Sequence, residues 1–345
     1  MRLGILTGGG DCPGLNAVIR AAVVRAVRAH DASIVGILDG WVGLLKDRTR
    51  PLDLDAIAGI LPRGGTMLGT SRTDPFREPP GIDGIRASVR SLALDGLLVC
   101  GGDGTLAAAG RVHDAGVPIV GIPKTIDNDV PGTDYSFGFD TALTTIVRAV
   151  DSLHSTAESH DRVIVVEVMG RTTGWLAVSS GIAGGADVVV APEEPVSVEE
   201  VCDFIRHRIA RGREFSIVVV AEGARFKPDP DGWALELPHR LDPKGRVQFG
   251  GVGGVVAAEI QKRLGVETRT VTLGYVQRGG TPTAFDRLLG SRMGVAAVDL
   301  AARNEYGRMV SLQGGAIGSV PLSVVQQGPR VVTHDLYEVA RVFFG

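Results

Sequence analysis

Short runs of aliphatic residues alternate with amphipathic stretches along this chain. The runs are rich in Val, Ile and Leu without regular polar alternation, which is typical of parallel strands buried on both faces. They lie at residues 3–6, 33–38, 96–100, 118–122, 162–168, 216–222 and 269–276. Between them come helical patterns, clearest in residues 141–154, where apolar residues share one face behind a cap at Asp140 or Thr141. This alternation predicts an α/β fold with largely parallel sheets.

Glycine and polar residues follow directly after most of the aliphatic runs. Six such segments are TGGGDCPG (7–14), GGDGT (101–105), PKTIDND (123–129), MGRTTG (169–174), GARF (223–226) and QRGGTP (277–282). Open α/β sheets bind ligands at the carboxyl ends of their strands, where these segments are predicted to lie. We therefore expect a large, polar, composite cleft. Residues 225–255, dense in Pro, Asp and Gly, interrupt the alternation and predict a surface excursion, with a hairpin as one form.

The composition is that of a soluble globular protein, with 345 residues, 44% hydrophobic and 22% charged. This length suits one large or two medium domains, and the two halves are candidates for similar α/β units. No apolar run reaches the roughly 18 residues that cross a bilayer, and the amino terminus lacks a signal-peptide pattern, so we expect a cytoplasmic protein. The net charge of −3 favours neither nucleic acid nor membrane as a partner, so any anion site must be local.

Two composition details narrow the chemistry. Cys12, Cys100 and Cys202 are odd in number and far apart, which predicts neither a disulfide framework nor a zinc site. Glycine accounts for 48 of 345 residues, well above its usual share of roughly 7%. In an aliphatic α/β chain this excess indicates many tight strand-to-helix turns, some of them close to a ligand.

Two of the glycine-rich segments are candidates for phosphate binding. In residues 7–14, backbone N–H groups and the start of the next helix can hold a phosphate, although a tight turn explains the glycines equally well. In residues 101–105, Asp103 adds a hard oxygen ligand of the kind that holds Mg²⁺ on a nucleotide. The alternative is a turn capped by Asp103. Because a glycine-rich loop follows a strand at two places, we favour binding of a phosphate and Mg²⁺ over simple turns.

Several arginines could clamp a phosphate. Arg72 and Arg77 lie in the glycine-rich segment 64–77, and Arg171 and Arg278 each follow a buried strand immediately. The planar guanidinium group is suited to bidentate phosphate binding.

The segment 121–135, GIPKTIDNDVPGTDY, has the residue types that phosphoryl transfer to a hydroxyl requires. Asp127 is a candidate base and Asp129 could orient the acceptor. Thr125 is a candidate donor to phosphate oxygens, and Lys124 is a candidate cation. These residues alone equally allow a turn before Pro131.

Seven motifs occur together in the order and approximate spacing of the 6-phosphofructokinases. They are TGGGDCPGLN, GGTMLGTSR, GGDGT, PKTIDND, VVEVMGR, AEG and LGYVQRGGTP. The chain resembles this family over nearly its whole length, and most closely the forms with a lysine before TIDND. The resemblance implies transfer of the γ-phosphoryl group of MgATP to the 1-hydroxyl of fructose 6-phosphate, a step of glycolysis.

The resemblance also implies site residues. Asp127 is the implied base, and Asp103 is associated with Mg²⁺. The implied catalytic set is Asp127, Arg171, Thr125 and Arg72. The implied donor site contains Gly10, Arg72, Gly102, Asp103, Gly104 and Thr105. The implied fructose 6-phosphate site contains Thr125, Asp127, Asp129, Arg162, Met169, Gly170, Arg171, Glu222, Arg269, Tyr275 and Arg278. Tyr275 stands where family members often carry a histidine.

Two residues point to different phosphoryl donors. Gly104 leaves room for the α-phosphate of ATP, whereas pyrophosphate-using relatives carry an aspartate there. Lys124 instead matches the lysine of pyrophosphate-dependent members. We favour ATP, because an aspartate blocks ATP whereas a lysine only adds attraction, and keep a pyrophosphate-dependent phosphotransferase as the alternative. A lipid or NAD kinase with a GGDGT loop is a distant alternative, since it has no need of TIDND and MGR.

The resemblance implies two similar three-layer, Rossmann-like domains with the active site in the cleft between them. We expect a larger donor domain from residues 1–138 plus about 277–305. The smaller fructose 6-phosphate domain is expected from 139–276 plus about 306–345. We also expect a homotetramer or homodimer in which Arg162 and Arg269 reach a neighbouring active site.

Overall fold

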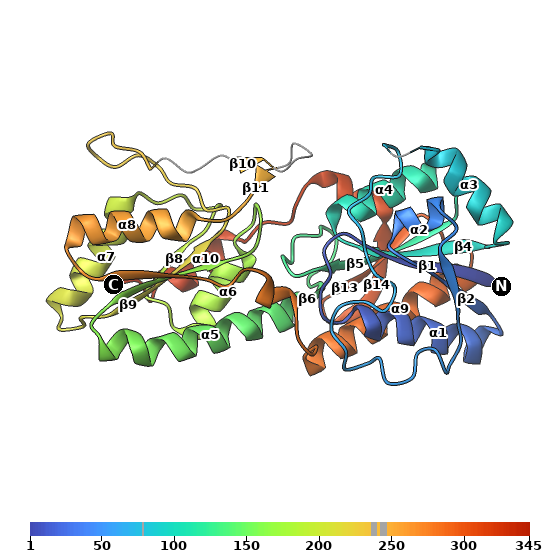
Figure 1. The fold of residues 1–345 in the computed structure, drawn as a ribbon, viewed down its shortest axis with the longest axis horizontal. Helices are drawn as coiled ribbons and strands as arrows, with labels where there is room; N and C mark the ends of the chain where they lie inside the picture. Colours follow the sequence, from blue (N-terminus) through green and yellow to red (C-terminus); the bar gives the residue numbers. More distant parts are fainter. Residues whose placement is uncertain (78, 236–239, 242–246) are drawn as a thin grey trace. The chain divides into compact units, whose positions relative to one another are not determined.

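The computed structural model describes residues 1–77, 79–235, 240–241 and 247–345 (Figure 1). The chain divides into two compact units. Unit 1 comprises Met1–Thr141 and Arg278–Arg330, and unit 2 comprises Ala142–Gln277 and Val331–Gly345. Each unit has its own sheet with helices on both faces.

Unit 1 is built on an eight-stranded sheet of order β14-β13-β5-β4-β1-β2-β3, with β6 paired to β5. The β2–β3 and β13–β14 pairs are antiparallel, and the other pairs are parallel. The strands are β1 (Arg2–Gly8), β2 (Ser33–Ile37), β3 (Thr49–Leu52), β4 (Gly96–Gly101), β5 (Ile119–Thr125), β6 (Phe137–Gly138), β13 (Arg308–Gln313) and β14 (Ala316–Pro321).

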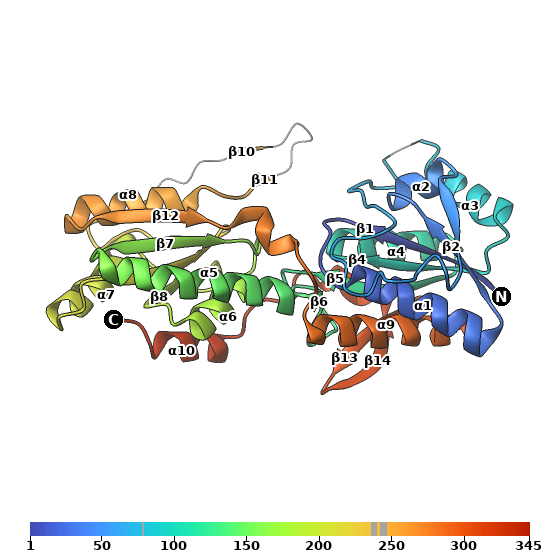
Figure 2. The ribbon, with the colours of Figure 1, turned by 60° about the horizontal axis from the view of Figure 1, so that its bottom comes forward.

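Helices cover both faces of this sheet (Figure 2). They are α1 (Leu15–His30), α2 (Trp41–Leu45), α3 (Gly81–Ser91), α4 (Asp103–Asp114), α9 (Ala284–Ala302) and the 3-10 helix η2 (Leu322–Gln327). On one face Leu97 and Val99 of β4 pack with Trp41, Ile85 and Leu106, which come from α2, α3 and α4. The other face carries α1 and α9, which pack side by side. Burying both faces explains the continuous aliphatic runs of the strands.

Unit 2 contains a four-stranded parallel sheet of order β12-β7-β9-β8. Its strands are β7 (Val163–Val168), β8 (Val188–Val190), β9 (Ser216–Ala221) and β12 (Thr268–Thr272). Its helices are α5 (Phe139–Ser159), which starts within unit 1, α6 (Trp175–Gly184), α7 (Val198–Ala210), α8 (Val252–Leu264), η1 (Gly274–Arg278) and α10 (His334–Arg341). Helices α7 and α8 cover one face, where Ile205 and Ile260 pack on Val165 and Val218. Helices α5, α6 and α10 cover the other (Figure 1).

The prediction of an α/β fold with mostly parallel sheets is confirmed. Two local predictions are wrong. Asp140 and Thr141 lie in the first turn of α5 rather than at its cap, since the helix begins at Phe139. The aliphatic run 269–276 is a strand only to Thr272, because Gly274, at φ +50°, opens η1.

Residues 306–330 belong to unit 1 and not, as predicted, to the smaller domain. The cause is a long-range pairing, since Arg308 and Met309 of β13 pair with Val120 and Gly121 of β5. The sequence gives no local sign of this partner.

In the predicted excursion at 225–255, β10 (Arg240–Leu241) and β11 (Val247–Gln248) form an antiparallel pair, and α8 already begins at Val252. Residues 236–239 and 242–246 of the excursion lie outside the described residues. Among the helices that the structure describes, none combines the length and apolar character that crossing a membrane requires.

Candidate active site

Three of the predicted loops meet at one edge of the unit 1 sheet. Gly8 of β1 lies opposite Gly101 of β4, and Gly101 lies opposite Pro123 of β5. Because these strands are parallel and end at the same level, the loops after them are neighbours. The structure thus brings together the loops beginning at Gly9, Gly102 and Lys124, as the sequence predicted for the carboxyl ends of the strands.

The first glycine loop is closely tied to the segment that carries Arg72. Gly9 adopts φ +82° and donates its N–H to the carbonyl of Ser71 at 2.9 Å. In return, Thr70 Oγ1 donates to the Gly9 carbonyl at 2.7 Å. Arg72 follows at once and its side chain is exposed. This places a cation beside the glycine loop, as a phosphate site requires.

Thr105 explains why glycines end two of the strands. A β-carbon added at Gly8 would lie 2.7 Å from Thr105 Cγ2, and one at Gly101 would overlap the same side chain. The buried Thr105 therefore packs across the ends of β1 and β4 from the first turn of α4. Its Oγ1 also lies 3.4 Å from the position of a β-carbon at Gly9. Thr105 holds both glycine loops in register.

The start of α4 can hold a polyphosphate with its metal ion. Gly102 is the N-cap, so Asp103 is the first helical residue and not the cap. Asp103 and Gly104 are exposed there, where the helix dipole favours an anion. Within the described parts of the chain no three His, Cys, Asp or Glu side chains form a metal cluster. The Asp103 carboxylate fits Mg²⁺, because proteins often hold this ion through one carboxylate and substrate phosphates.

Lys124 connects the third loop to the first. Its side chain is 3% exposed, and Nζ donates a hydrogen bond to the carbonyl of Gly10. The amine thus reaches from β5 to the loop after β1. Two buried thiols, those of Cys12 and Cys100, lie close enough to interact with its charge. Burial raises the pKa of Cys12 well above its ordinary value and that of Cys100 to about 12, with Lys124 acting in the opposite direction.

The TIDND segment has a defined, buried conformation. Asp127 and Asp129 are both buried. Thr125 Oγ1 accepts the N–H of Asp127 at 3.0 Å, and Asn128 Oδ1 accepts the N–H of Ser136 at 3.0 Å. The turn that was the alternative interpretation of this segment is therefore present. Its hydrogen bond is accepted by the side chain of Thr125 and not by that of an aspartate. The turn and the proposed chemistry do not exclude each other, because Thr125 fixes the backbone of Asp127.

In unit 2, the loops after β7 and β9 bring Arg171 and Glu222 together. Glu222 donates its N–H to the carbonyl of Val168 at 2.7 Å, and its Oε1 accepts the N–H of Arg171 at 3.0 Å. Arg171 itself has φ +53°. Gly170 has φ +140°, and a β-carbon there would lie 2.5 Å from the carbonyl oxygen of Thr173. The MGR turn therefore requires its glycine.

Gln277 ties a third segment to this turn. The side chain is fully buried, and its Oε1 accepts the N–H of Met169 at 3.1 Å. Gln277 lies in η1, as does Tyr275, which is 78% exposed. Met169, Gly170, Arg171 and Glu222 thus lie together at the carboxyl ends of β7 and β9. Gln277 was not among the predicted site residues, although it lies inside the QRGGTP motif.

Arg162 and Arg269 lie at the opposite end of the unit 2 sheet. Arg162 immediately precedes β7, and Arg269 pairs with Ile164 near the start of that strand. Both guanidinium groups form ion pairs with Glu267, and Arg162 Nε lies 2.9 Å from its Oε2. These contacts, with that of Arg162 the largest, lower the pKa of Glu267. Within unit 2, the length of strand β7, which is about 20 Å, separates these arginines from the MGR turn.

Arg278 lies in unit 1 beside the first glycine loop. Its Nη1 donates to the Asp11 carbonyl at 3.3 Å, and a β-carbon at Gly10 would overlap the guanidinium group. The sequence missed one further arginine of unit 1, Arg330. It donates from its N–H to the carbonyl of Asp129 at 2.7 Å and from Nη2 to that of Asn128 at 3.0 Å. Nothing in its surrounding sequence is a recognised motif.

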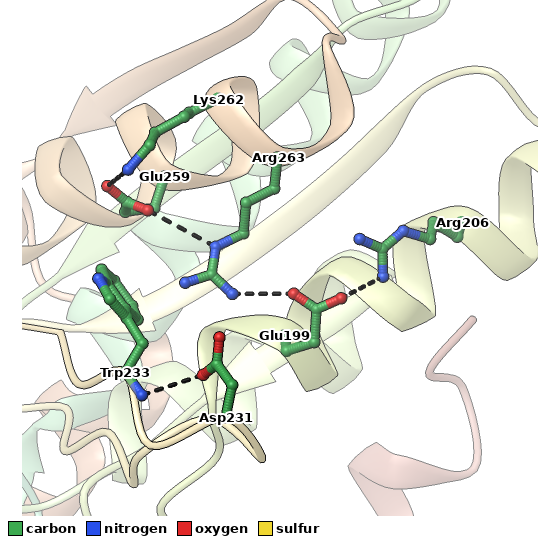
Figure 3. Close-up of a pocket in the computed structure, with 7 residues that line it drawn as sticks. All are labelled: Glu199, Arg206, Asp231, Trp233, Glu259, Lys262 and Arg263. Atoms are coloured by element: carbon green, nitrogen blue, oxygen red, sulfur yellow. Dashed lines mark hydrogen bonds and ion pairs between the residues drawn. The ribbon is translucent and has the colours of Figure 1, made fainter.

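A surface pocket of about 360 Å³ lies in unit 2 and is lined by none of the predicted site residues (Figure 3). Its lining residues are Glu199, Arg206, Asp231, Trp233, Glu259, Lys262 and Arg263. Arg263 is paired with Glu199 at 2.8 Å and stacks at 4.4 Å from the centre of the Trp233 ring. Arg206 is likewise paired with Glu199 at 2.6 Å. Since these arginines are neutralised by acidic neighbours, the pocket resembles a structural ion-pair network more than an anion site.

Comparison with known proteins points to one family. The family model for phosphofructokinase matches residues 2–301. The chain is 50% identical to a pyrophosphate–fructose 6-phosphate 1-phosphotransferase of Streptomyces coelicolor, over 100% of both chains. It is 49% identical to an ATP-dependent 6-phosphofructokinase of Mycobacterium leprae, again over 100% of both.

Solved structures agree in fold. Phosphofructokinase from Saccharomyces cerevisiae superposes with a TM-score of 0.80 at 32% identity, over 94% of this chain and 45% of the yeast chain. A pyrophosphate-dependent phosphofructokinase from Marinobacter aquaeolei gives a TM-score of 0.83 at 21% identity, over 100% of this chain and 92% of the other, and so supports the fold alone. The glycine loops, the TIDND segment and the MGR turn thus occur in a chain that belongs to the phosphofructokinase family.

Proposed function

We propose that this protein is a 6-phosphofructokinase that transfers the γ-phosphoryl group of MgATP to the 1-hydroxyl of fructose 6-phosphate. One observation carries the proposal: strands β1, β4 and β5 end at one edge of the unit 1 sheet, so the loops that follow them are neighbours. They supply glycine backbone, a helix N-terminus, the Asp103 carboxylate and the Asp127 carboxylate. Phosphoryl transfer depends mainly on such positioning and on charge stabilisation.

In this proposal the acceptor is activated by Asp127. Its carboxylate takes the proton of the 1-hydroxyl as that oxygen forms a bond to the γ-phosphorus. The bond from the γ-phosphorus to the bridging oxygen breaks, and ADP leaves with its electron pair. Arg171 and Arg72 offset the charge on the transferred group, and Thr125 donates to its oxygens. Mg²⁺ bound with the donor would be held by Asp103 and would offset charge on the phosphate oxygens.

Residues of unit 2 bind the sugar phosphate in this scheme. Met169, Gly170 and Glu222 contact the sugar, Asp129 orients it from unit 1, and Arg278 and Tyr275 lie near the phosphate. Support comes from the MGR turn, in which Glu222 Oε1 holds the N–H of Arg171 at 3.0 Å. Arg162 and Arg269 serve a neighbouring subunit of a homotetramer or homodimer, because they lie at the opposite end of their own sheet.

Gly104 favours ATP as donor. A β-carbon added there would meet no atom within 4 Å, so the space beside the first turn of α4 is open to a nucleotide. Lys124 favours pyrophosphate as a second candidate, because its Nζ reaches the Gly10 carbonyl in the donor loops. The relatives include proteins named for each donor.

An aldolase-coupled assay with a single donor decides between the two. We expect turnover of fructose 6-phosphate with MgATP as the sole phosphoryl donor. Turnover with pyrophosphate alone would replace the ATP assignment by the pyrophosphate-dependent one. Absence of turnover with either donor would contradict the whole proposal.

The base assignment has its own test in Asp127→Ser. Loss of the general base should lower kcat by about 10²- to 10⁴-fold, while calorimetry still detects fructose 6-phosphate binding. Asp95→Ser is a matched control, since this carboxylate accepts the Arg2 N–H at 2.7 Å beside the start of β1 and has no assigned role in the transfer. Comparable kcat values for the two variants would show that Asp127 is not the base.

A further inference from the structure

Arg330 holds the loop on which Asp127 lies. Its backbone N–H donates to the carbonyl of Asp129 at 2.7 Å, and Nη2 of its half-buried side chain donates to the carbonyl of Asn128 at 3.0 Å. Two consecutive carbonyls of the TIDND segment are therefore bound by one residue that follows them by about 200 positions. We propose that Arg330 is a positioning residue that keeps the Asp127 loop in its active conformation.

The loop has a conformation that needs such support. Asn128 adopts φ +52°, in the left-handed region that residues other than glycine rarely occupy. The backbone at such a position persists only where its surroundings determine it. On one side Thr125 Oγ1 holds the N–H of Asp127, and Ser136 holds the Asn128 side chain. Arg330 holds the carbonyls that follow Asp127, so the peptide groups on both sides of the carboxylate are fixed.

Arg330 also brings a positive charge to an acidic region. The carboxylates of Asp129 and Asp134 lie near enough to favour its charged form, although burial acts against it and lowers its pKa. An arginine remains protonated in such surroundings, because its ordinary pKa is far above neutral pH. A lysine in its place would keep the charge but lose the planar group, with its five N–H donors.

The chain passes from unit 1 into unit 2 directly after Arg330. Two residues later, the N–H of Val332 donates to Glu193 Oε1 at 3.1 Å within unit 2. The same oxygen accepts the N–H of Gly174 at 2.9 Å, the N-cap of α6. Arg330 is thus held by hydrogen bonds within unit 1, and Val332 by a hydrogen bond within unit 2.

This inference rests on the proposed function, because it assigns Asp127 the role of base. Arg330→Met removes the guanidinium group and keeps an apolar stem of similar length. We expect kcat to fall by about ten- to a hundredfold, as small displacements of a reacting group can cause. The KM for the donor should stay unchanged, because the donor loops after β1 and β4 are not touched. A purely structural role would instead reduce the amount of active enzyme without this pattern.

Arg308→Met is the matched control. Arg308 is a half-buried arginine of the same unit whose Nη2 donates to the carbonyl of Ser319 at 2.8 Å, far along the chain from the TIDND segment. It should lose a comparable side-chain-to-carbonyl bond without a comparable loss of kcat. Added guanidinium chloride at millimolar concentration should restore part of the activity of Arg330→Met and none in the control. Equal kcat values for the two variants would overturn the inference.

Two further measurements keep the test decisive. If Arg330→Met does not fold, Arg330→Lys is compared with wild type, and an unchanged kcat overturns the inference. Hydrogen exchange of the peptide spanning residues 125–136 should be faster in the Arg330 variants than in Arg308→Met, and equal exchange overturns it too. Hydrogen exchange can be measured whether or not the enzyme is active. Failure of the proposed function is therefore recognised separately, because the wild-type protein would then not phosphorylate fructose 6-phosphate.

Discussion

At the scale of single residues, Gly104 is the position at which the proposed choice of donor can be tested. It is exposed in the first turn of α4, and an added β-carbon would meet no other atom within 4 Å. A side chain at this position can therefore change the electrostatics of the donor site without disturbing the packing. The glycines at 8 and 101 differ, because their missing side chains make room for Thr105.

Gly104→Asp should remove most of the activity with ATP. Under the proposed function, the new carboxylate would stand close to the α-phosphate of ATP. Like charges brought together cost several kcal/mol, so kcat/KM for ATP should fall about a hundredfold or more. Gly104→Ala is the control, since its methyl group carries no charge and meets open space. Pyrophosphate should be affected less. Unchanged use of ATP by Gly104→Asp would show that the donor does not pass position 104.

Residues that act through others were not found from the sequence. Asp127, Arg171 and Glu222 belong to local motifs, and their neighbours in the chain indicate their chemistry. Arg330 belongs to no motif, and its partners lie about 200 residues earlier. Glu267 was missed for a related reason, because its importance comes from two arginines with which it forms ion pairs. Such roles depend on packing, which a single sequence does not display.

At the scale of elements, a buried carboxyl joins the start of α9 to the start of α5. Asp286 Oδ2 accepts hydrogen bonds from the N–H of Thr141 at 2.8 Å and from its Oγ1 at 2.5 Å. The side chain is fully buried. Burial raises its pKa to about 6, while the bonds from Thr141 act against this rise. Ionised Asp286 is therefore less favourable in the folded protein than in the unfolded chain.

The sign of the resulting pH dependence follows from linkage. The folded-state pKa of about 6 lies above the unfolded value of about 3.9, so the folded protein binds more protons between these pH values. The contribution of Asp286 to the free energy of unfolding therefore decreases as pH rises from about 4 to about 6. Asp286→Asn removes this dependence, and its stability relative to wild type should increase by about 2 kcal/mol across the interval. Urea unfolding of both proteins at pH 4, 5, 6 and 7 measures the difference, and parallel curves would contradict the assignment.

The elements themselves were predicted better than their partners. Aliphatic runs identified the central strands, because strands buried on both faces must be continuously apolar. The run 269–276 predicts one strand, but Gly274 at φ +50° turns the chain out of the sheet into η1. The assignment of residues 306–330 failed because β13 pairs with β5, whose register is set by tertiary contacts. Local periodicity reports burial but not which strand lies alongside.

At the scale of the whole molecule, the cations are distributed between different places despite the net charge of −3. Arg171 lies at the carboxyl end of the unit 2 sheet, whereas Arg162 and Arg269 lie at its amino end with Glu267 between them. About 20 Å of strand separates the two groups in one unit. Under the proposed function, Arg162 and Arg269 therefore complete the site of a neighbouring subunit, and full activity requires an oligomer.

Complementation between inactive variants tests this sharing. Asp127→Ser lacks the base, and Arg162→Ala lacks one sugar-phosphate cation, so each should have little activity alone. If each site combines Asp127 of one subunit with Arg162 of another, random mixing at equal amounts gives about a quarter of the sites both intact groups. Co-expression of the two variants should then restore about a quarter of wild-type kcat at saturating fructose 6-phosphate. Arg162→Ala mixed with Arg269→Ala is the control. Every chain in this mixture lacks one of the two arginines, so a site that takes both from one neighbour is never complete and no activity should be regained. No gain in the first mixture would place Arg162 outside the active site of any neighbouring subunit.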